Sequence, residues 1–355
     1  MKKKILISTG GSGGHVVPAI TISDHLKEEY EILISTDLRG KKYVNSTDYE
    51  IIIVDTPRLN SLFLFPFKVL KIFILCLKSY FIMKKKKIKI LISTGGYMSL
   101  PLCLAAKLLG INIFLLEPNM VLGRANNFFL HFCEKIICYS KEVIGFPKKF
   151  INKIVVLNPI MRKKYYEKNL DTQVNKIFTL MIVGGSQGAR VFDEIMHEII
   201  VRVSKIHPIK IIHQTSKENI DFLKNYYSTY KIENTVFSYD ENLHILLRQS
   251  NLCITRAGAS TLAELSLLNV PFLAIPLPTS KDNHQQENAN YYKIRKCCWV
   301  IEQNKLNKKT FEEFLLSILK NNDILFKIKN NLENLNYQNT WNNVNQKLLK
   351  IINEN

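Results

Sequence analysis

The chain has 355 residues, of which 46% are hydrophobic, so it can form two domains of ordinary size that each bury a core. Its formal net charge of +19 would suit a nucleic acid or an anionic membrane, although a lysine-rich composition accounts for part of that charge. No RNA-binding signature, zinc-finger spacing or interleaved aromatic ladder accompanies the charge, so we expect no nucleic-acid partner.

The first predicted domain covers residues 1–158. Short runs rich in Ile, Leu and Val alternate there with helical segments, and we expect strands at 5–9, 31–35, 51–55, 88–94, 113–116, 136–138 and 154–157. Continuously apolar strands separated by helices are typical of a parallel sheet that is covered on both faces. The first strand follows the N-terminal lysines directly and is too short for the hydrophobic region of a signal peptide, so we expect no export.

A glycine-rich turn follows the first strand and precedes a predicted helix. Glycine allows positive φ and a close approach of the backbone, and the start of a helix offers unpaired N–H groups to an anion. Ser12, Gly13 and Gly14 could therefore donate backbone and hydroxyl hydrogen bonds to a phosphate. His15 lies at the mouth of the helix, where an imidazole could accept a proton, although such a histidine could also cap or pack locally.

An apolar and basic stretch covers residues 59–83, and four lysines follow it at 84–87. A membrane-spanning helix needs about 20 apolar residues with few charges, so the three internal lysines and one proline argue against a span. At helical spacing Lys68, Lys71 and Lys78 fall on one narrow face and leave a wide apolar surface around them.

The charge around this stretch favours a membrane surface as its partner. No Asp or Glu occurs between Asp55 and Glu117, an interval that carries ten Lys or Arg residues. Basic clusters joined to apolar side chains hold peripheral proteins on anionic lipid, whereas the alternative is a core helix with a solvated rim. The predicted membrane dock comprises Phe65, Phe67, Lys68, Lys71, Ile72, Phe73 and Lys78.

Two further loops are expected at the carboxyl edge of the first sheet. Gly95, Gly96 and Tyr97 follow one predicted strand, and Asn119 follows the next. Ligands of parallel sheets bind beyond the carboxyl ends of the strands, so Tyr97, Asn119 and His15 would share one rim.

The second predicted domain covers residues 159–335, and a C-terminal helix at 336–355 is expected to return toward the first domain. Its strands are predicted at 178–183, 209–214, 235–237, 252–255, 272–275 and 299–301, again with helices between them. The glycine-rich turn at 183–189 repeats the pattern of the first turn, which predicts a second doubly wound sheet with a second anion-binding turn.

The loop after the strand at 252–255 enters a helix that carries Thr261 and Glu264 at capping-box spacing. This spacing favours Glu264 as a structural carboxylate that bonds the start of the helix. The same carboxylate could instead accept hydrogen bonds from the two hydroxyls of a ribose. Gln285 and Asn288 lie one helical turn apart and could present amides to a sugar.

Several common motifs do not occur in the sequence. It contains no Asp-x-Asp pair, Walker lysine, His-Glu-x-x-His or Gly-x-Ser-x-Gly. We therefore expect neither a metal nor a cofactor, with the charge of a diphosphate met by helix starts, hydroxyls and an arginine. The seven cysteines form no Cys-x-x-Cys pair, which predicts reduced thiols in a cytosolic protein.

Together these motifs resemble one family, the undecaprenyldiphospho-muramoylpentapeptide β-N-acetylglucosaminyltransferases of peptidoglycan synthesis (the MurG family). The resemblance lies in Gly10-Gly11-Ser12-Gly13-Gly14-His15, Thr94-Gly95-Gly96-Tyr97, Glu117-Pro118-Asn119, Gly184-Gly185-Ser186-Gln187-Gly188-Ala189, Arg256-Ala257-Gly258-Ala259 with Thr261 and Glu264, and His284-Gln285 with Asn288-Ala289. The match runs in order from Ile5 to about Tyr292, and the joint set is far more specific than its parts. It implies a GT-B architecture, in which two doubly wound, parallel-sheet, Rossmann-like α/β domains face a central cleft.

The resemblance also implies roles for individual residues. His15 is similar to the proposed general base for the 4-hydroxyl of muramic acid. The residues implied to bind UDP-GlcNAc are Ser12, Gly13, Gly14, Asn119, Arg162, Ser186, Ala259, Ser260, Thr261, Glu264 and Gln285, and those implied on the acceptor side are Gly95, Gly96 and Tyr97. Arg162 comes one residue later than the arginine of the family's Gly-Asn-Pro-Val-Arg pattern.

The activity implied by the resemblance is an inverting, metal-independent transfer of GlcNAc from UDP-GlcNAc to lipid I, which forms lipid II. The enzyme would work as a peripheral protein on the cytoplasmic face of the cell membrane, with anionic phospholipid and other cell-wall synthesis proteins as partners. A related transferase that glycosylates diacylglycerol is one alternative. A non-catalytic protein that binds a nucleotide sugar or nucleic acid is the other.

Overall fold

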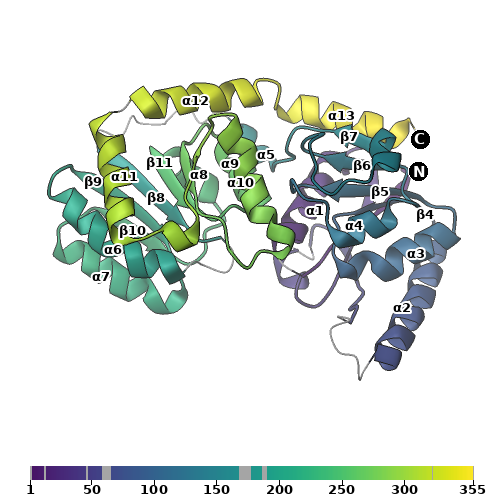
Figure 1. The fold of residues 1–355 in the computed structure, drawn as a ribbon. Helices are drawn as coiled ribbons and strands as arrows, with labels where there is room; N and C mark the ends of the chain where they lie inside the picture. Colours follow the sequence, from purple (N-terminus) through teal and green to yellow (C-terminus); the bar gives the residue numbers. More distant parts are fainter. Residues whose placement is uncertain are drawn as a thin grey trace. The chain divides into compact units, whose positions relative to one another are not determined.

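The computed structural model describes residues 2–11, 13–44, 47–57, 65–167, 177–185, 190–321 and 323–354 (Figure 1). The chain divides into two compact units, of which unit 1 is Met1–Lys163 with Thr340–Asn355 and unit 2 is Lys164–Asn339. The predicted α/β class with two doubly wound parallel sheets is confirmed, because each unit contains its own parallel sheet.

The described part of unit 1 contains seven parallel strands in the order β3-β2-β1-β4-β5-β6-β7. Their bounds are β1 Lys4–Ser8, β2 Glu31–Thr36, β3 Glu50–Ile53, β4 Ile88–Ser93, β5 Asn112–Glu117, β6 Lys135–Cys138 and β7 Ile154–Val156. All seven predicted strands are confirmed, with ends that differ by at most two residues. The strand order reverses between β1 and β4, so the loops after these strands flank the switch point at which doubly wound sheets bind ligands.

Helices cover both faces of this sheet. Along β1, Ile5 and Ile7 belong to one buried cluster and Leu6 belongs to the other, because successive side chains of a strand point to opposite faces. The helices are α1 Gly13–Leu26, α2 Phe65–Lys86, α3 Leu100–Leu108, α4 Arg124–Phe129 and α13 Trp341–Asn353, with 3-10 helices η1 Lys41–Tyr43, η2 Tyr97–Ser99 and η3 Lys148–Lys153. A short helix, α5 Lys163–Tyr166, lies where the chain passes from unit 1 to unit 2.

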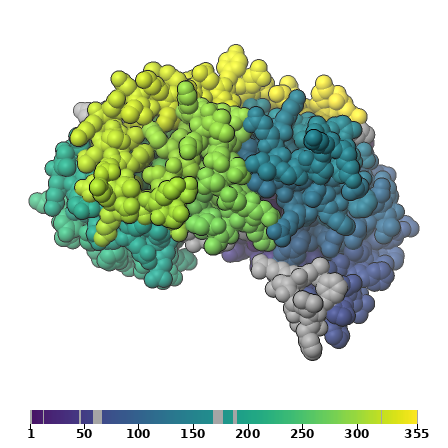
Figure 2. Space-filling model, in the orientation of Figure 1, coloured from purple at the N-terminus to yellow at the C-terminus, as the bar shows by residue number. Residues whose placement is uncertain are grey.

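Helix α13 packs on unit 1 although it follows unit 2 in the chain (Figure 2, yellow). Val344 and Leu348 join the buried cluster that contains residues of α1 and β1. Trp341 stacks on His25 of α1, with ring centroids 3.7 Å apart. Burial lowers the pKa of His25 to about 4, so the stacked imidazole is neutral near pH 7.

The described part of unit 2 contains six parallel strands in the order β10-β9-β8-β11-β12-β13. Their bounds are β8 Phe178–Val183, β9 Ile209–Gln214, β10 Asn234–Phe237, β11 Leu252–Thr255, β12 Phe272–Ala274 and β13 Trp299–Val300, and all six predicted strands are confirmed. The switch point of this sheet lies between β8 and β11, and the second glycine-rich turn begins where β8 ends.

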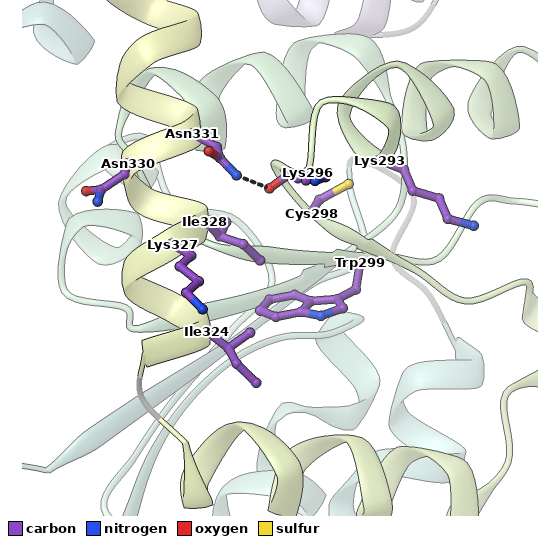
Figure 3. Close-up of a pocket in the computed structure, with 9 residues that line it drawn as sticks. All are labelled: Lys293, Lys296, Cys298, Trp299, Ile324, Lys327, Ile328, Asn330 and Asn331. Atoms are coloured by element: carbon purple, nitrogen blue, oxygen red, sulfur yellow. Dashed lines mark hydrogen bonds between the residues drawn. The ribbon is translucent and has the colours of Figure 1, made fainter.

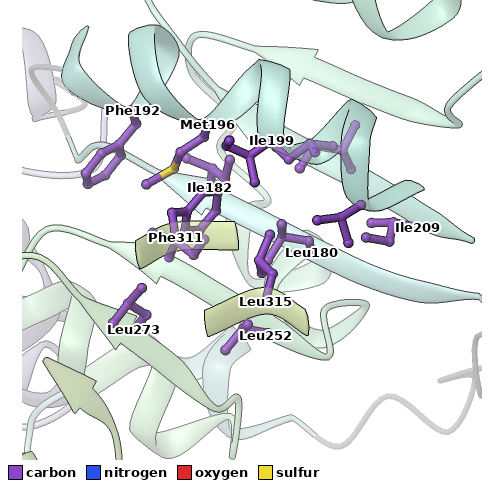
Figure 4. Packing of buried hydrophobic residues seen from close by; sticks show 14 of the residues in the cluster. Leu180, Ile182, Phe192, Met196, Ile199, Ile209, Leu252, Leu273, Phe311 and Leu315 are labelled. Carbon is purple, nitrogen blue, oxygen red and sulfur yellow. The ribbon is translucent and has the colours of Figure 1, made fainter. Parts of the chain in front are cut away.

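The helices of unit 2 pack their apolar faces on this sheet. They are α6 Arg190–Ser204, α7 Ile220–Thr229, α8 Leu243–Arg248, α9 Ala259–Leu267, α10 His284–Ile294, α11 Lys308–Lys320 and α12 Asp323–Asn336, with 3-10 helices η4 Lys217–Asn219, η5 Lys281–Asn283 and η6 Gln303–Lys305. Figure 4 shows the core, in which Leu180 and Ile182 of β8 meet Met196 of α6 and Phe311 and Leu315 of α11. These buried contacts fix the carboxyl ends of the strands that carry the candidate site.

Candidate active site

The loops after β1 and β4 meet at the switch point of unit 1. Nδ1 of His15 lies 2.8 Å from the carbonyl oxygen of Thr94. A carbonyl can only accept, so Nδ1 carries the hydrogen, and Nε2 of the neutral ring then has a lone pair that can accept a proton. A further hydrogen bond of 2.9 Å from the Thr94 hydroxyl to the Thr9 hydroxyl joins the two loops. The half-buried ring of His15 is therefore held in one orientation by the loop after β4.

Gly95 and Gly96 give the loop after β4 its shape. Their φ angles are +84° and +82°, in the region that favours glycine. A Cβ atom on Gly96 would lie 3.0 Å from the Met98 methyl carbon and 3.7 Å from Nε2 of His15. Glycine at this position therefore keeps the space beside the imidazole open, and Tyr97 follows directly in η2.

The loop after β5 is held by the buried carboxylate of Glu117. Oε1 accepts hydrogen bonds from the side-chain and backbone N–H groups of Asn119, at 3.0 and 3.2 Å. Oε2 accepts hydrogen bonds from the backbone of Gly123, at 2.7 Å, and from the amide of Asn126, at 2.9 Å. Glu117 thus orients Asn119, and Asn126 in turn lies beside Gly95. The structure brings the loops that carry His15, Tyr97 and Asn119 together, as the strand-end rule predicts.

Two residues at this edge, Asp37 and Arg39, were not predicted from the sequence. Asp37 directly follows β2, and its Oδ1 accepts the backbone N–H groups of Gly11 and Gly40, each at 2.8 Å. Its Oδ2 accepts Nε and Nη2 of Arg39, at 3.0 and 2.8 Å. Arg39 also donates a hydrogen bond to the hydroxyl of Tyr97. Their position after β2 could have identified these residues, because the strand-end rule covers the loop after β2 as well.

The first turn of α9 lies at the switch point of unit 2 and contains Ala259, Ser260 and Thr261. The helix begins after Gly258, and no side chain of the described residues caps it. The predicted capping box is therefore wrong, because Thr261 lies inside the first turn rather than before it. The N–H groups of this turn have no partner within the helix and can bind an anion, while Glu264 lies buried further along the same helix.

Two amides of α10 hold the loop that leads into α9. Oε1 of Gln285 accepts the backbone N–H groups of Ala257, at 3.2 Å, and of Leu277, at 2.9 Å. The buried amide of Asn288 donates to the carbonyl of Ala257 at 3.1 Å. Asn288 is therefore a structural residue, contrary to the expectation that it faces a sugar. Gln285 can offer a ligand only its amide N–H groups, since its oxygen is already shared by two donors.

The remaining predicted site residues lie in several parts of the chain. Ser12 and Ser186 lie outside the described residues, and Gly13 and Gly14 form the first positions of α1. Arg162 is half-buried in unit 1, after β7. In unit 2 the guanidinium of Arg256 lies 4.9 Å from the ring centroid of Phe192 and donates to the carbonyl of Ile275, so it faces the protein interior.

Helix α2 buries one side and exposes a second apolar side. It packs against α3 (Figure 1) and buries Ser79, Met83 and Ile72, which is only 9% exposed. The prediction that Ile72 belongs to the membrane dock is therefore wrong, because this side chain faces the protein. The exposed apolar side chains of α2 are Phe67, Val69, Leu70, Phe73, Ile74, Leu77 and Phe81, and we name them the α2 stripe. Of the predicted lysines, Lys71 and Lys78 are exposed and Lys68 is half-buried, and nothing is described of the Phe65 side chain.

Figure 3 shows a cavity of unit 2, whose volume is about 520 Å³. Side chains from the end of α10, β13 and α12 line it, including Lys293, Trp299 and Lys327. None of the described candidate residues is among its lining residues. Among the described residues, no group of three or more His, Cys, Asp or Glu side chains could hold a metal. None of the described helices combines the length and apolar character needed to cross a membrane.

Comparison with known proteins gives full-length matches. Residues 5–138 match the glycosyltransferase family 28 N-terminal domain, and residues 179–341 match the glycosyltransferase family 28 C-terminal domain. The chain is 44% identical to the UDP-N-acetylglucosamine–N-acetylmuramyl-(pentapeptide) pyrophosphoryl-undecaprenol N-acetylglucosamine transferase of Pelagibacter ubique, over 100% of both chains. It is 34% identical to the enzyme of the same name from Rickettsia canadensis, over 93% of this chain and 94% of the relative. The crystal structure of Acinetobacter baumannii MurG has the same fold, with a TM-score of 0.78, 23% identity and 100% of both chains covered.

Proposed function

The chain belongs to the family of UDP-N-acetylglucosamine–N-acetylmuramyl-(pentapeptide) pyrophosphoryl-undecaprenol N-acetylglucosamine transferases, within glycosyltransferase family 28, and we propose that it converts lipid I to lipid II. The donor would be UDP-GlcNAc, and the acceptor would be undecaprenyl-diphospho-MurNAc-pentapeptide. The identity over the whole of both chains carries the proposal. The position of His15 at the switch point of unit 1 supplies the chemistry.

In the proposed reaction, Nε2 of His15 takes the proton of the 4-hydroxyl of muramic acid. The oxygen then forms a bond to C1 of GlcNAc as the bond from C1 to the β-phosphate oxygen breaks, and UDP leaves with the electron pair. A single in-line displacement inverts the anomeric carbon and gives a β-linked product. A positioned base contributes about 10²-fold to 10⁴-fold to such a step.

The donor would be bound by unit 2. The N–H groups of the first turn of α9, at Ala259, Ser260 and Thr261, would donate hydrogen bonds to a phosphate, and Glu264 would accept hydrogen bonds from the ribose hydroxyls. The amide N–H groups of Gln285 would bond the hydroxyls of GlcNAc. Fixed dipoles of this kind stabilise a departing diphosphate without a metal ion, and we include metal independence in the proposal.

The experiment that tests this function measures UDP release from UDP-GlcNAc. It is run with a short-chain lipid I analogue, with diacylglycerol and with no acceptor, each with and without EDTA. We expect turnover only with the lipid I analogue, at a rate that EDTA does not change. Turnover with diacylglycerol would reassign the acceptor, loss of turnover in EDTA would contradict metal independence, and no turnover with any acceptor would favour a binding protein.

We also propose that the α2 stripe rests on the cytoplasmic face of the cell membrane. Phe67, Phe73 and Phe81 of the stripe are 71%, 58% and 64% exposed, and the exposed lysines Lys71 and Lys78 lie on the same helix. Aromatic side chains buried in an interface together with lysines near anionic headgroups hold a peripheral protein.

Flotation with vesicles of phosphatidylglycerol and phosphatidylethanolamine tests the dock. We expect the triple variant Phe67→Ser, Phe73→Ser and Phe81→Ser to stay at the bottom of the gradient while the unmodified protein floats. The matched control is Phe222→Ser with Phe326→Ser, which removes exposed phenylalanines of α7 and α12 in unit 2. Equal flotation of the α2 variant and the control would contradict the dock.

A further inference from the structure

Arg39 reaches across the carboxyl end of β1. Strands β2 and β4 both pair with β1, and Arg39 follows β2 while its hydrogen-bond partner Tyr97 follows β4. A Cβ atom on Gly11 would lie 3.8 Å from Nη2 of Arg39. The guanidinium therefore lies directly beside the first glycine-rich turn, between the two loops that flank the switch point.

The buried carboxylate of Asp37 fixes this guanidinium. The Asp37 side chain is 1% exposed and accepts two hydrogen bonds from Arg39, whose own side chain is 44% exposed. Burial alone would raise the pKa of Asp37, but the hydrogen bonds from Gly11, Gly40 and Arg39 hold it below its usual value. An exposed lysine moves through many rotamers, whereas this pair holds a planar cation in one place.

The same geometry leaves one end of Arg39 open to a ligand. Nε donates to Asp37, and Nη2 donates to Asp37 and to Tyr97. Nη1 makes no hydrogen bond within the described part of the chain, so its two hydrogens can be donated to a ligand.

One backbone donor of the first turn is already used within the protein. The N–H of Gly11 is bonded to Asp37, so this backbone donor is not available to a phosphate. A purely structural role would not require Arg39, since Asp37 already joins the turn to the loop after β2 through Gly11 and Gly40. What Arg39 adds is a fixed positive charge at the surface.

We propose that Arg39 binds a phosphate oxygen of the acceptor's diphosphate through Nη1, and that Asp37 is the positioning residue that aims it. The proposal rests on the proposed function for the identity of the acceptor. The chemistry it predicts is recognition of an isoprenoid diphosphate, and binding tests this without turnover.

The test is isothermal titration of the full chain with farnesyl diphosphate, and separately with UDP. A hydrogen bond between two charged groups is stronger than one between neutral groups, so we expect Arg39→Gln to weaken farnesyl diphosphate binding by about 10-fold or more. Arg39→Lys should weaken it less, because the charge remains without the planar fork. UDP binding should be unchanged in both variants.

Lys41→Gln is the matched control. Lys41 is an exposed lysine two residues from Arg39, so the variant removes the same charge from the same loop. We expect it to bind farnesyl diphosphate as the unmodified protein does. The proposal is overturned if Arg39→Gln binds normally, if Lys41→Gln weakens binding equally, or if the unmodified protein does not bind the probe.

Kinetics with the lipid I analogue separate the proposal from the proposed function. We expect Arg39→Gln and Asp37→Asn to raise the KM for the acceptor while the KM for UDP-GlcNAc and the kcat stay within about threefold. If the unmodified protein shows no turnover, the proposed function fails, and the titration still decides the role of Arg39. If Asp37→Asn does not fold, the Arg39 variants decide the result.

Discussion

In unit 1 the carboxylate of Asp37 comes from the loop after β2 and bonds Gly11, in the turn after the neighbouring strand β1. In unit 2 the corresponding carboxylate, Asp193 of α6, accepts a hydrogen bond of 2.7 Å from the hydroxyl of Thr215, which follows β9, the strand beside β8. In each unit a hydrogen bond thus joins the segment after the first strand to the loop after the second strand. The carboxylate lies in the later of these two segments in unit 1 and in the earlier one in unit 2.

The side chains paired with these carboxylates also differ. Arg39 extends to the surface, whereas His213 is fully buried, with Nε2 3.1 Å from Asp193 and Nδ1 2.9 Å from the hydroxyl of Tyr227. Burial would raise the pKa of Asp193, but hydrogen bonds from His213 and its neighbours hold it below its usual value. The repeated strand-turn-helix motif is therefore accompanied by an exposed guanidinium in unit 1 and by a buried imidazole in unit 2, so repetition in sequence does not imply repetition of chemistry.

Replacing the proposed base of unit 1 should have the largest effect. The effect should be on the chemical step and not on the binding of UDP. We expect His15→Ala to lower kcat by about 10²-fold or more while UDP affinity is unchanged, because the base acts on the acceptor. His131→Ala removes an exposed histidine of the same unit and serves as the control. Steady-state kinetics and UDP titration measure both effects, and a kcat within threefold of normal for His15→Ala would rule out the base.

The next effect is a loss of stability, which we expect where atoms pack closely around the first glycine-rich turn. A Cβ atom on Gly40 would lie 2.2 Å from the Thr36 hydroxyl and 3.0 Å from Cα of Gly10, so Gly40→Ala should lower the free energy of unfolding by about 1–3 kcal/mol. In unit 2 a Cβ atom on Gly258 would come no closer than 4.0 Å to its nearest neighbour, Thr261, so Gly258→Ala should change it by less than about 0.5 kcal/mol. Urea denaturation compares the two, and equal losses would contradict the contrast.

Two substitutions of Gln285 in unit 2 separate its structural role from its proposed binding role. Gln285→Glu keeps an acceptor oxygen for Ala257 and Leu277 but loses the amide donors, so we expect the KM for UDP-GlcNAc to rise about 10-fold with little loss of stability. Gln285→Ala should raise KM similarly and also lower the free energy of unfolding by about 1–3 kcal/mol, since two backbone N–H groups lose their acceptor. A Glu variant with normal KM would show that Gln285 is only structural.

The smallest effect concerns pH and again distinguishes the units. His25 has an ordinary pKa of 6.5 when unfolded and a pKa of about 4 in the fold, so its stabilising contribution is complete above about pH 6.5 and is lost as pH falls toward 4. At pH 5.5 the loss in unit 1 should be about 1 kcal/mol. Trp341 and Trp299 are the chain's two tryptophans and lie in different units, so a Trp299→Phe variant reports on unit 1 alone. His25→Phe should remove this pH dependence, and its persistence would assign it to another group.

The sequence predicts the strands and the loops well because their signals are local. Continuous apolar runs fix β1 to β13, and the strand-end rule correctly brings the loops of His15, Tyr97 and Asn119 together. The roles of these residues remain predictions that the proposed experiments test. What the alternation of strands and helices establishes is the sheet edge at which the chemistry can occur.

The misses involve information that is not local. The helical spacing of α2 predicts a wide apolar surface but not which part of it packs on α3, so the prediction for Ile72 is wrong. The capping-box spacing predicts that the helix begins after Thr261, but α9 begins after Gly258. The path of the preceding loop decides where the helix begins. Asp37 and Arg39 carry no motif, and their roles follow only from contacts with Gly11 and Tyr97, which lie far away in the sequence.

The central claim is transfer of GlcNAc to the 4-hydroxyl of muramic acid with inversion. Mass spectrometry and proton NMR of the product formed from UDP-GlcNAc and a short-chain lipid I analogue test it most directly. We expect the acceptor to gain one N-acetylhexosamine in a β-1,4 linkage, and His15→Ala to abolish this product. An α linkage, attachment at another hydroxyl, or an unchanged acceptor would contradict it.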